Sequence, residues 1–266
     1  MLDRFNRRIN YLRISVTDRC NLRCTYCMPE KGIRLIPHDE ILRYEEILEV
    51  VREAALLGIE KVRITGGEPL VRKGVENLVA MISGVPGIRE LTLTTNAVLL
   101  EEYAQKLADA GLHRINISLD TVDPVKYYTI TRGGYLHKVL SGIEAARAAG
   151  LDPVKINCVV QHSSDEPNAR EVREFCEKNG LEARFIHRMD LESGCFTVVE
   201  GGTGGDCRSC NRLRLTANGY IKPCLFDNLS FSIRELGPRG ALYQAIGLKP
   251  EKGTKNTVNQ FNNIGG

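Results

Sequence analysis

The chain has 266 residues and lacks the run of about 18 apolar residues that a membrane-spanning helix requires. Its first eight residues also lack the apolar core of a secretory signal peptide. The formal net charge is only +3, too small for a protein that coats nucleic acid. We therefore expect a cytoplasmic protein with neither a membrane nor a nucleic-acid partner. Any recognition of anions has to come from local groups of basic residues.

Cysteine, in contrast, is abundant. In the reducing compartment that we expect, nine cysteines indicate metal ligands rather than disulfides. Cys158 lies in an apolar strand pattern and Cys176 on a helical one, so both are predicted to be small buried residues. Six others form two groups, and Cys195 stands apart. The two groups are Cys20, Cys24 and Cys27, and Cys207, Cys210 and Cys224.

The first group has the spacing Cys-x3-Cys-x2-Cys and follows an apolar, strand-like segment directly. Three thiolates this close can hold three corners of a [4Fe–4S] cube and leave the fourth iron open. An open iron is a coordination site, so the pattern indicates chemistry rather than electron storage. The alternatives are a structural zinc site or buried thiols without a metal.

Strand-like and helix-like runs alternate from about residue 8 to residue 190. The predicted strands are Tyr11–Val16, Lys61–Thr65, Glu90–Thr95, Arg114–Leu119, Val154–Val160 and Ala183–Met189. A helical pattern precedes Gly58, and others cover Val75–Ser83, Glu101–Ala110, Leu136–Ala149 and Ala169–Asn179. Short connections between β-α units predict a parallel sheet with right-handed crossovers, and hence an α/β fold that closes as a partial (β/α)6 barrel.

The predicted strands alternate between apolar and polar residues, whereas parallel strands buried on both faces usually read as continuous apolar runs. Helices must cover the apolar face, so the polar face lines the interior of the barrel. That face is rich in cations, which cannot lie there isolated because burial of a lone charge is costly. We therefore predict an open interior that accepts an anionic ligand. Its basic residues are Arg13, Lys61, Arg63, Lys155 and Arg184.

The second cysteine group has the spacing Cys-x2-Cys-x13-Cys. Asn218-Gly219 predicts a hairpin turn that folds Cys224 back towards Cys207 and Cys210. Arg212 and Arg214 alternate along the preceding run, so both can point into one space. This pattern is compatible with zinc or with a second iron–sulfur cluster.

The cysteine motif Cys20–Cys27, with Tyr26 before its third cysteine, resembles the signature of the radical S-adenosylmethionine (SAM) superfamily. The resemblance implies a partial (β/α)6 barrel and a [4Fe–4S] cluster whose open iron chelates SAM. It also implies that reduction releases a 5′-deoxyadenosyl radical. By the same resemblance, Gly66-Gly67-Glu68 after the second strand binds the SAM amino group, although a plain turn is the alternative. The expected cofactor contacts are Tyr26, Gly66, Gly67, Glu68, Asn96 and Ser118.

Within that superfamily, the chain is similar to the GTP 3′,8-cyclase family, which begins molybdenum cofactor biosynthesis. The similarity is carried by Leu12–Cys20, Arg63–Leu70, Leu93–Asn96, Arg114–Asp120, Arg184–Ile186, Cys207-x2-Cys-x-Arg-x-Arg and Ile264-Gly265-Gly266. It implies a barrel over residues 1–190 and an auxiliary cluster region over 191–266. It also implies two [4Fe–4S] clusters, abstraction of the ribose 3′-hydrogen of GTP, and an electron donor such as flavodoxin or ferredoxin. A homodimer is left open.

In that family, the second cluster keeps an open iron for guanine, basic residues hold the triphosphate, and a diglycine tail enters the active site. The implied substrate residues are Arg13, Lys61, Arg63, Lys155, Arg184, Arg212, Arg214, Gly265 and Gly266.

The chain departs from this family at four places. Ala97 replaces the usual glycine after Thr-Thr-Asn, and His187-Arg188 replaces an acidic and an apolar residue. The stretch between Met189 and Cys207 is several dozen residues shorter. Cys195 lies within it, and a fourth thiolate would close the second cluster. Three readings remain open: the cyclase; a related enzyme acting on another nucleotide-like substrate or a peptide, with a fully ligated cluster; and a non-catalytic iron–sulfur or zinc protein.

Overall fold

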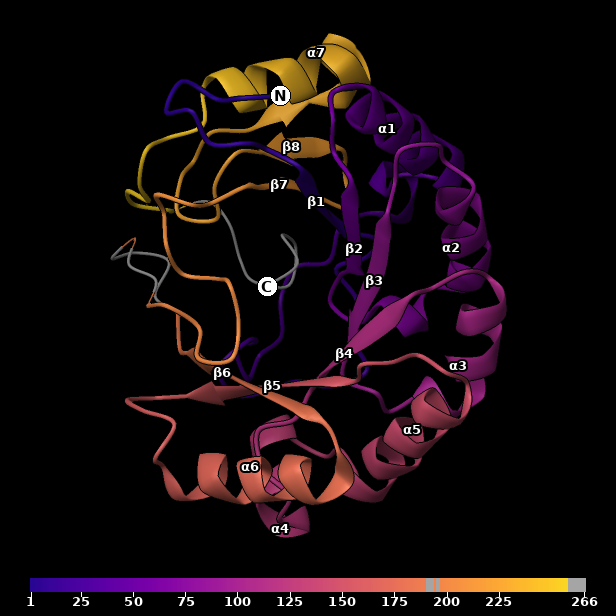
Figure 1. Ribbon diagram of the computed structural model, residues 1–266, viewed down its shortest axis with the longest axis vertical. Helices are drawn as coiled ribbons and strands as arrows, with labels where there is room; N and C mark the ends of the chain where they lie inside the picture. Colours follow the sequence, from indigo (N-terminus) through magenta and orange to yellow (C-terminus); the bar gives the residue numbers. More distant parts are fainter. Residues whose placement is uncertain (190–193, 195–196, 258–266) are drawn as a thin grey trace.

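A curved sheet with helices on its outer face forms the body of the protein (Figure 1). The structure is a computed structural model that describes residues 1–189, 194 and 197–257. Nine strands of the described residues follow the order β6-β5-β4-β3-β2-β1-β7-β8-β9, in which β6 and β9 are the two outermost strands. The strands from β6 to β7 in this order pair in parallel. β8 pairs antiparallel with β7, and β9 pairs antiparallel with β8. The predicted α/β fold with a partial, unclosed barrel is confirmed.

All six strands predicted before residue 190 are present, with ends that differ by a residue or two. They are β1 (Tyr11–Ser15), β2 (Lys61–Thr65), β3 (Glu90–Thr95), β4 (Arg114–Ser118), β5 (Lys155–Val160) and β6 (Glu182–His187). The remaining strands are β7 (Arg212–Leu215), β8 (Tyr220–Lys222) and β9 (Phe231–Ser232). The turn predicted at Asn218-Gly219 joins β7 to β8, where Leu215 pairs with Ile221.

Helices cover the convex face of the sheet (Figure 1). They are α1 (Tyr44–Leu56), α2 (Val75–Ser83), α3 (Leu100–Asp109), α4 (Pro124–Thr131), α5 (Leu136–Ala148), α6 (Pro167–Asn179) and α7 (Ile233–Gly247). In α1, Ile47, Val50, Val51 and Ala54 are buried at helical spacing, and Glu46 caps the first turn by accepting from the Arg43 amide at 2.8 Å. Single-turn 3₁₀ helices lie at His38–Glu40 and Pro69–Val71.

One core joins the apolar face of the strands to the helices. Leu12 and Ile14 of β1 are fully buried, as are Val62 and Ile64 of β2. Cys158 and Cys176 are each 1% exposed, which confirms the prediction that both are buried. The apolar half of each alternating strand thus packs under the helices, and its polar half faces the concave side.

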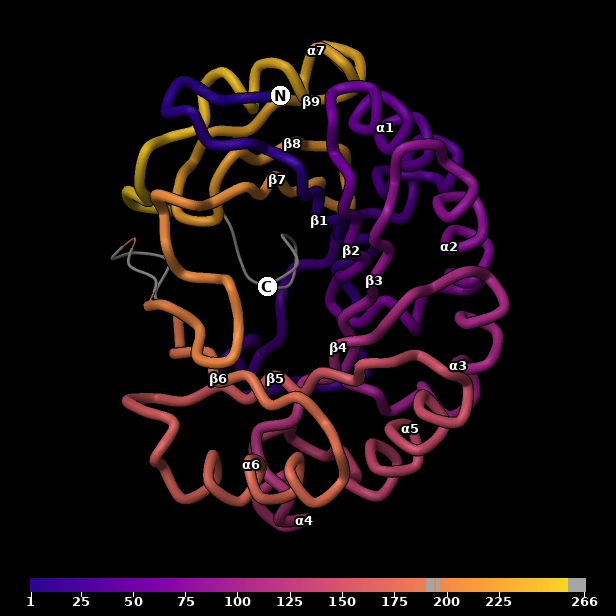
Figure 2. The backbone as a smooth tube through the Cα atoms, in the orientation of Figure 1, coloured from indigo at the N-terminus to yellow at the C-terminus, as the bar shows by residue number. Residues whose placement is uncertain are grey.

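The C-terminal third of the chain joins the same sheet. β7 pairs in parallel with β1, so that Arg214 lies opposite Arg13. Helix α7, kinked at Gly237-Pro238, lies beside the N-terminal segment (Figure 2). The division at residue 190 stays a prediction, but the sheet runs across it. In the described part of the chain, no helix is long and apolar enough to cross a membrane.

Candidate active site

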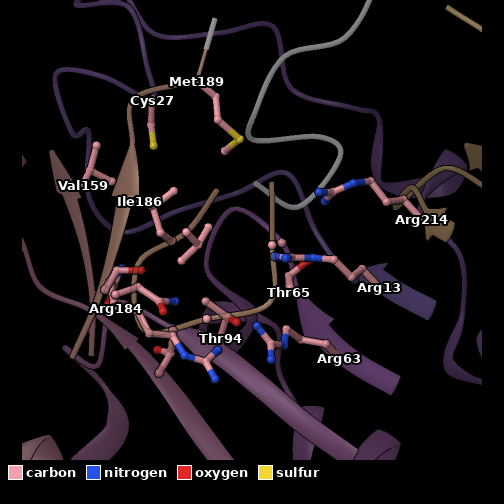
Figure 3. A pocket seen from close by; sticks show the side chains of 18 of the residues that line it. Arg13, Cys27, Arg63, Thr65, Thr94, Val159, Arg184, Ile186, Met189 and Arg214 are labelled. Atoms are coloured by element: carbon pink, nitrogen blue, oxygen red, sulfur yellow. The ribbon is translucent and has the colours of Figure 1, made fainter. Parts of the chain in front are cut away.

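A cavity of about 360 Å³ lies on the concave side of the sheet. Its lining brings together side chains from β1–β7 and from loops that follow several of these strands. Figure 3 shows the Cys27 thiol and Met189 at one end of the view, and Arg63 and Arg184 at the other. The polar strand faces therefore converge on one chamber, as the alternation predicted.

The first cysteine loop, which carries Cys20, Cys24 and Cys27, follows β1, and hydrogen bonds hold it on both sides. Asp18, 1% exposed, accepts a hydrogen bond from the Ile36 amide at 2.5 Å, which closes the loop at its base. At the far side, Arg132 of the α4 C-cap donates to the carbonyl oxygens of Arg23 (3.1 Å) and Met28 (2.8 Å). The backbone of Thr25 also bonds to Ile130. Cys24 and Cys27 are thus held between α4 and the end of β1.

Gly66 and Gly67 pack against the chain that leads into this loop. The Gly67 amide donates to the Thr17 carbonyl at 2.7 Å, and the Glu68 amide donates to the Arg19 carbonyl at 2.8 Å. A Cβ atom on Gly67 would lie 2.4 Å from that Arg19 oxygen, so no larger residue fits without movement. The paired glycines therefore place the loop after β2 directly beside Cys20.

Glu68 is 1% exposed and lines the cavity, and three donors of the protein bind its carboxylate. It accepts hydrogen bonds from the amides of Leu70 (3.0 Å) and Asn96 (2.7 Å) and from the Thr95 hydroxyl (2.7 Å). Burial raises the pKa of Glu68 to about 7, although these donors favour the ionised form. Glu68 thus joins the glycine loop to the end of β3.

Asn96, Tyr26 and Ser118 all line the cavity near the first cysteine group. The Asn96 side chain donates to the side-chain oxygen Oδ1 of Asn21 at 2.7 Å and to the Cys20 sulfur at 3.8 Å. The Tyr26 hydroxyl donates to Asp120 at 2.6 Å. These contacts place the predicted SAM-binding residues together around the cysteine loop.

The cavity lining is strongly basic, with eight lysine or arginine side chains against two glutamates. Glu90 pairs with Lys61 at 3.0 Å and with Arg114. Burial and the neighbouring Arg212 lower the pKa of Arg214 to about 10. Among the described residues, the Arg184 and Arg212 Nε atoms and Thr94 Oγ1 are buried without a hydrogen-bond partner. Such donors indicate a site built for an anion.

Six of the seven basic residues predicted to bind substrate line the cavity. Lys155 is not among the lining residues described; it forms an ion pair with Glu182 on the neighbouring strand β6. His187 and Arg188, which depart from the family pattern, do line it. Ala97 adopts a left-handed φ of 62°, a conformation that favours the glycine usual at this position.

The second cysteine group lies behind Arg212 and Arg214, and its thiols are not among the described lining residues. Two buried cations hold its backbone. Arg7 donates to the Cys207 carbonyl at 2.8 Å, and Lys249, 1% exposed, donates to the carbonyls of Arg212 (2.8 Å) and Pro223. Lys249 also bonds to the Cys210 thiol; although burial raises the Cys210 pKa, Lys249 and the Arg212 amide lower it overall.

The first cysteine group lies where burial disfavours thiolates unless a metal is bound. Burial raises the pKa of Cys20 to about 11 and that of Cys27 to about 12, and the charges of Asp120 and Cys20 add to the shift at Cys27. A cationic cluster reverses this, because metal coordination stabilises thiolates. In the described ranges, no three His, Cys, Asp or Glu side chains converge on a single metal ion. Cysteines of a cube bind different irons and need not converge.

Cys195, Gly265 and Gly266 lie outside the described residues, so their predicted roles stay predictions. Sequence reasoning missed several residues that the fold brings to the site: Asp120, Arg132, Arg7, Lys249 and Tyr11. Asp120 was the easiest of these to predict from the sequence, because it follows Ser118 on the polar face of the same alternating run. The others depend on contacts between segments far apart in the chain.

Residues 14–176 match the family model described as the radical SAM superfamily. The chain is 41% identical to the GTP 3′,8-cyclase of Pelotomaculum thermopropionicum over 95% of this chain and 94% of the relative. It is 38% identical to that of Thermodesulfovibrio yellowstonii over the full length of both, in an alignment of 322 residues. That relative therefore holds several dozen residues that this chain lacks.

Two solved structures support the fold alone. The structure of anSMEcpe with bound S-adenosylmethionine has a TM-score of 0.62 and 16% identity, over 91% of this chain and 81% of that one. Streptococcus suis SuiB bound to S-adenosylmethionine has a TM-score of 0.56 and 21% identity, over 69% of this chain and 41% of SuiB. Because the family model matches residues 14–176 and the relatives match over almost the whole chain, the chain belongs to the radical SAM superfamily of enzymes and, within it, to the GTP 3′,8-cyclase family.

Proposed function

We propose that this protein is a two-cluster radical SAM lyase that takes GTP and begins molybdopterin biosynthesis. The observation that carries the proposal is the basic cavity between the first cysteine loop and the Arg212–Arg214 strand. Eight cationic side chains against two carboxylates favour a ligand with several negative charges, such as a triphosphate. The family assignment supplies the nucleotide.

At one end, Cys20, Cys24 and Cys27 would hold the first [4Fe–4S] cluster. Gly66, Gly67, Asn96 and Ser118 would hold SAM beside it. When bound, the cluster and SAM supply the 5′-deoxyadenosyl radical that abstracts the ribose 3′-hydrogen of GTP. Glu68 would join the SAM-binding residues, because Oε1 accepts from Leu70 and Thr95 whereas Oε2 accepts only from Asn96, which leaves Oε2 an acceptor position for the SAM ammonium group.

At the other end, Cys207, Cys210 and Cys224 would hold the second cluster, whose open iron would supply a binding site for guanine. Arg13, Arg63, Arg184, Arg212 and Arg214 bind the triphosphate, for which guanidinium forks have the right geometry. The protein's contribution is then orientation, electrostatics and exclusion of water, since the cofactors supply the radical chemistry. Gly265 and Gly266 would complete the site.

A second substrate class is favoured by one specific observation. His187 and Arg188 add a basic and an ionisable side chain to the cavity where the family usually has an acidic and an apolar residue. A related nucleotide-like substrate with a further anionic group would use them. The assay below separates this candidate from GTP.

The test is substrate-dependent cleavage of SAM by anaerobically reconstituted protein, with flavodoxin or ferredoxin and reductant as the electron source. GTP should give the cyclised nucleotide together with 5′-deoxyadenosine. Cys27→Ala should abolish both products, whereas Cys176→Ala, a buried thiol outside both groups, should retain them. Formation of 5′-deoxyadenosine with no cyclised product would refute the cyclase assignment; a panel of nucleotides and peptides would then reveal the substrate.

A further inference from the structure

Tyr11 lines the cavity together with its basic side chains. It opens β1, where it pairs with Lys61 of β2 on one side and with Arg212 of β7 on the other. The guanidinium carbon of Arg63 lies 5.7 Å from the centre of its ring, and that of Arg212 lies 5.6 Å from it. Each neighbouring strand thus contributes one cation to the same aromatic ring.

Both arginines belong to the set proposed to bind triphosphate, and they repel one another. Burial lowers the pKa of Arg63, and Arg212 and Arg114 lower it further, while Tyr11 favours its charged form. An aromatic ring between two guanidinium groups attracts both, because its face is electron-rich. Among the described residues, Arg63 also donates to the Thr92 hydroxyl at 3.1 Å, and Arg212 also donates to the Thr203 carbonyl at 3.4 Å.

The Tyr11 hydroxyl is buried and lacks a hydrogen-bond partner among the described residues. Cations surround it on three strands: Arg13 on β1, Lys61 and Arg63 on β2, and Arg212 and Arg214 on β7. Burial alone would raise the pKa of Tyr11, but the fields of Arg63, Arg13, Arg212 and Arg214 outweigh burial and lower it. The side chain therefore senses the charge of the arginine cluster directly.

We propose that Tyr11 is a positioning residue for the polyphosphate end of the substrate. The Tyr11 ring holds the guanidinium groups of Arg63 and Arg212 close enough together to bind one anion. This inference rests on the proposed function for the identity of the nucleotide, but not for the anionic chemistry of the site. Without the ring, the two guanidinium groups would separate, and the cavity would lose affinity for phosphate oxygens rather than for SAM.

The test compares Tyr11→Leu, which removes the ring, with Tyr11→Phe, which keeps it. Equilibrium binding of inorganic triphosphate and of GTP is measured on anaerobically reconstituted protein. Tyr11→Leu should weaken both ligands by about 5- to 30-fold, the loss of two cation–π contacts. Tyr11→Phe should restore affinity to within about threefold. Tyr128→Leu, which removes a tyrosine 52% exposed outside the cavity, is the matched control and should bind like wild type.

A second measurement, the ionisation of Tyr11, distinguishes a positioning role from a structural one. The chain has no tryptophan, so tyrosinate absorbance can be followed in the difference between wild type and Tyr11→Phe during an alkaline titration. One tyrosine should ionise below the pH expected of free tyrosine. Added triphosphate should raise that pH, because it neutralises the surrounding guanidinium charge.

Three results would overturn the inference. They are wild-type affinity for triphosphate in Tyr11→Leu, an equal loss of affinity in Tyr11→Phe and Tyr11→Leu, or a Tyr11 titration that triphosphate does not shift. Wild-type protein that binds inorganic triphosphate but not GTP would instead refute the proposed substrate and leave the role of Tyr11 standing.

Discussion

Replacing Lys249 with methionine should release the second cysteine group from its support. Lys249 is among the largest fully buried side chains, and its ammonium group lies between two segments that carry cysteines. It donates to the carbonyls of Arg212 and Pro223 and bonds to the Cys210 thiol. Methionine fills a similar volume but donates nothing, so the substitution isolates the charge and the hydrogen bonds.

The magnitude follows from the bonds lost. A hydrogen bond to a charged group contributes about 1.5–3 kcal/mol, and two carbonyl oxygens would become buried without donors. Removing a buried ammonium also removes its desolvation cost, which offsets part of the loss. We expect the free energy of unfolding to fall by about 2–4 kcal/mol, which corresponds to a decrease in Tm of about 5–15 °C for a chain of this size.

Thermal unfolding followed by circular dichroism under anaerobic conditions measures the stability, and iron analysis measures cluster retention. Lys249→Met should lose iron selectively from the second site, while SAM still perturbs the electron paramagnetic resonance signal of the first. Lys252→Met, an exposed lysine three residues later, is the control and should match wild type. Full iron content and an unchanged Tm in Lys249→Met would refute the reasoning.

Two further predictions concern single side chains. Burial raises the pKa of Glu68 to about 7, so the stability that it contributes is complete below about pH 4.5 and is lost as pH rises towards 7. Glu68→Gln cannot ionise, so its Tm should rise relative to that of wild type as the pH increases from 5 to 8. The corresponding gain in unfolding free energy is up to about 3 kcal/mol. A constant difference in Tm would contradict this. Cys195→Ala should retain about eight irons per reconstituted chain, since Cys207, Cys210 and Cys224 suffice for an open second cluster. A decrease towards about four irons would identify Cys195 as a ligand.

The strands before residue 190 were predictable because their signal is local. Each is a short alternating run whose apolar half, such as Leu12 and Ile14, can be buried only on one face. The alternation also predicted which basic side chains face the cavity, and among the five predicted on β1–β6 Lys155 was the exception. Its residue parity is right, but Glu182 on the next strand captures its ammonium group, and nothing local to Lys155 indicates that partner.

The elements that sequence reasoning missed have weak local patterns. Helix α4 is only eight residues long and has two buried positions, Tyr127 and Thr131. Helix α7 is interrupted at Gly237-Pro238, which hides its apolar periodicity. The position of β7 beside β1 could not be deduced either, because more than 190 residues separate the two strands and pairing choice is a tertiary property.

The sequence by itself determined the reacting groups: two sets of three cysteines at cluster spacing, paired glycines after β2, and a row of basic residues on the polar face of the strands. These follow from residue type and spacing along a few residues of chain. Only the tertiary structure decided how they meet. It placed Arg212 and Arg63 on either side of Tyr11, set Lys249 behind the second cysteines, and engaged Glu68 with the end of β3. Each of these contacts joins residues at least 26 positions apart, where only the packing of the whole sheet selects partners.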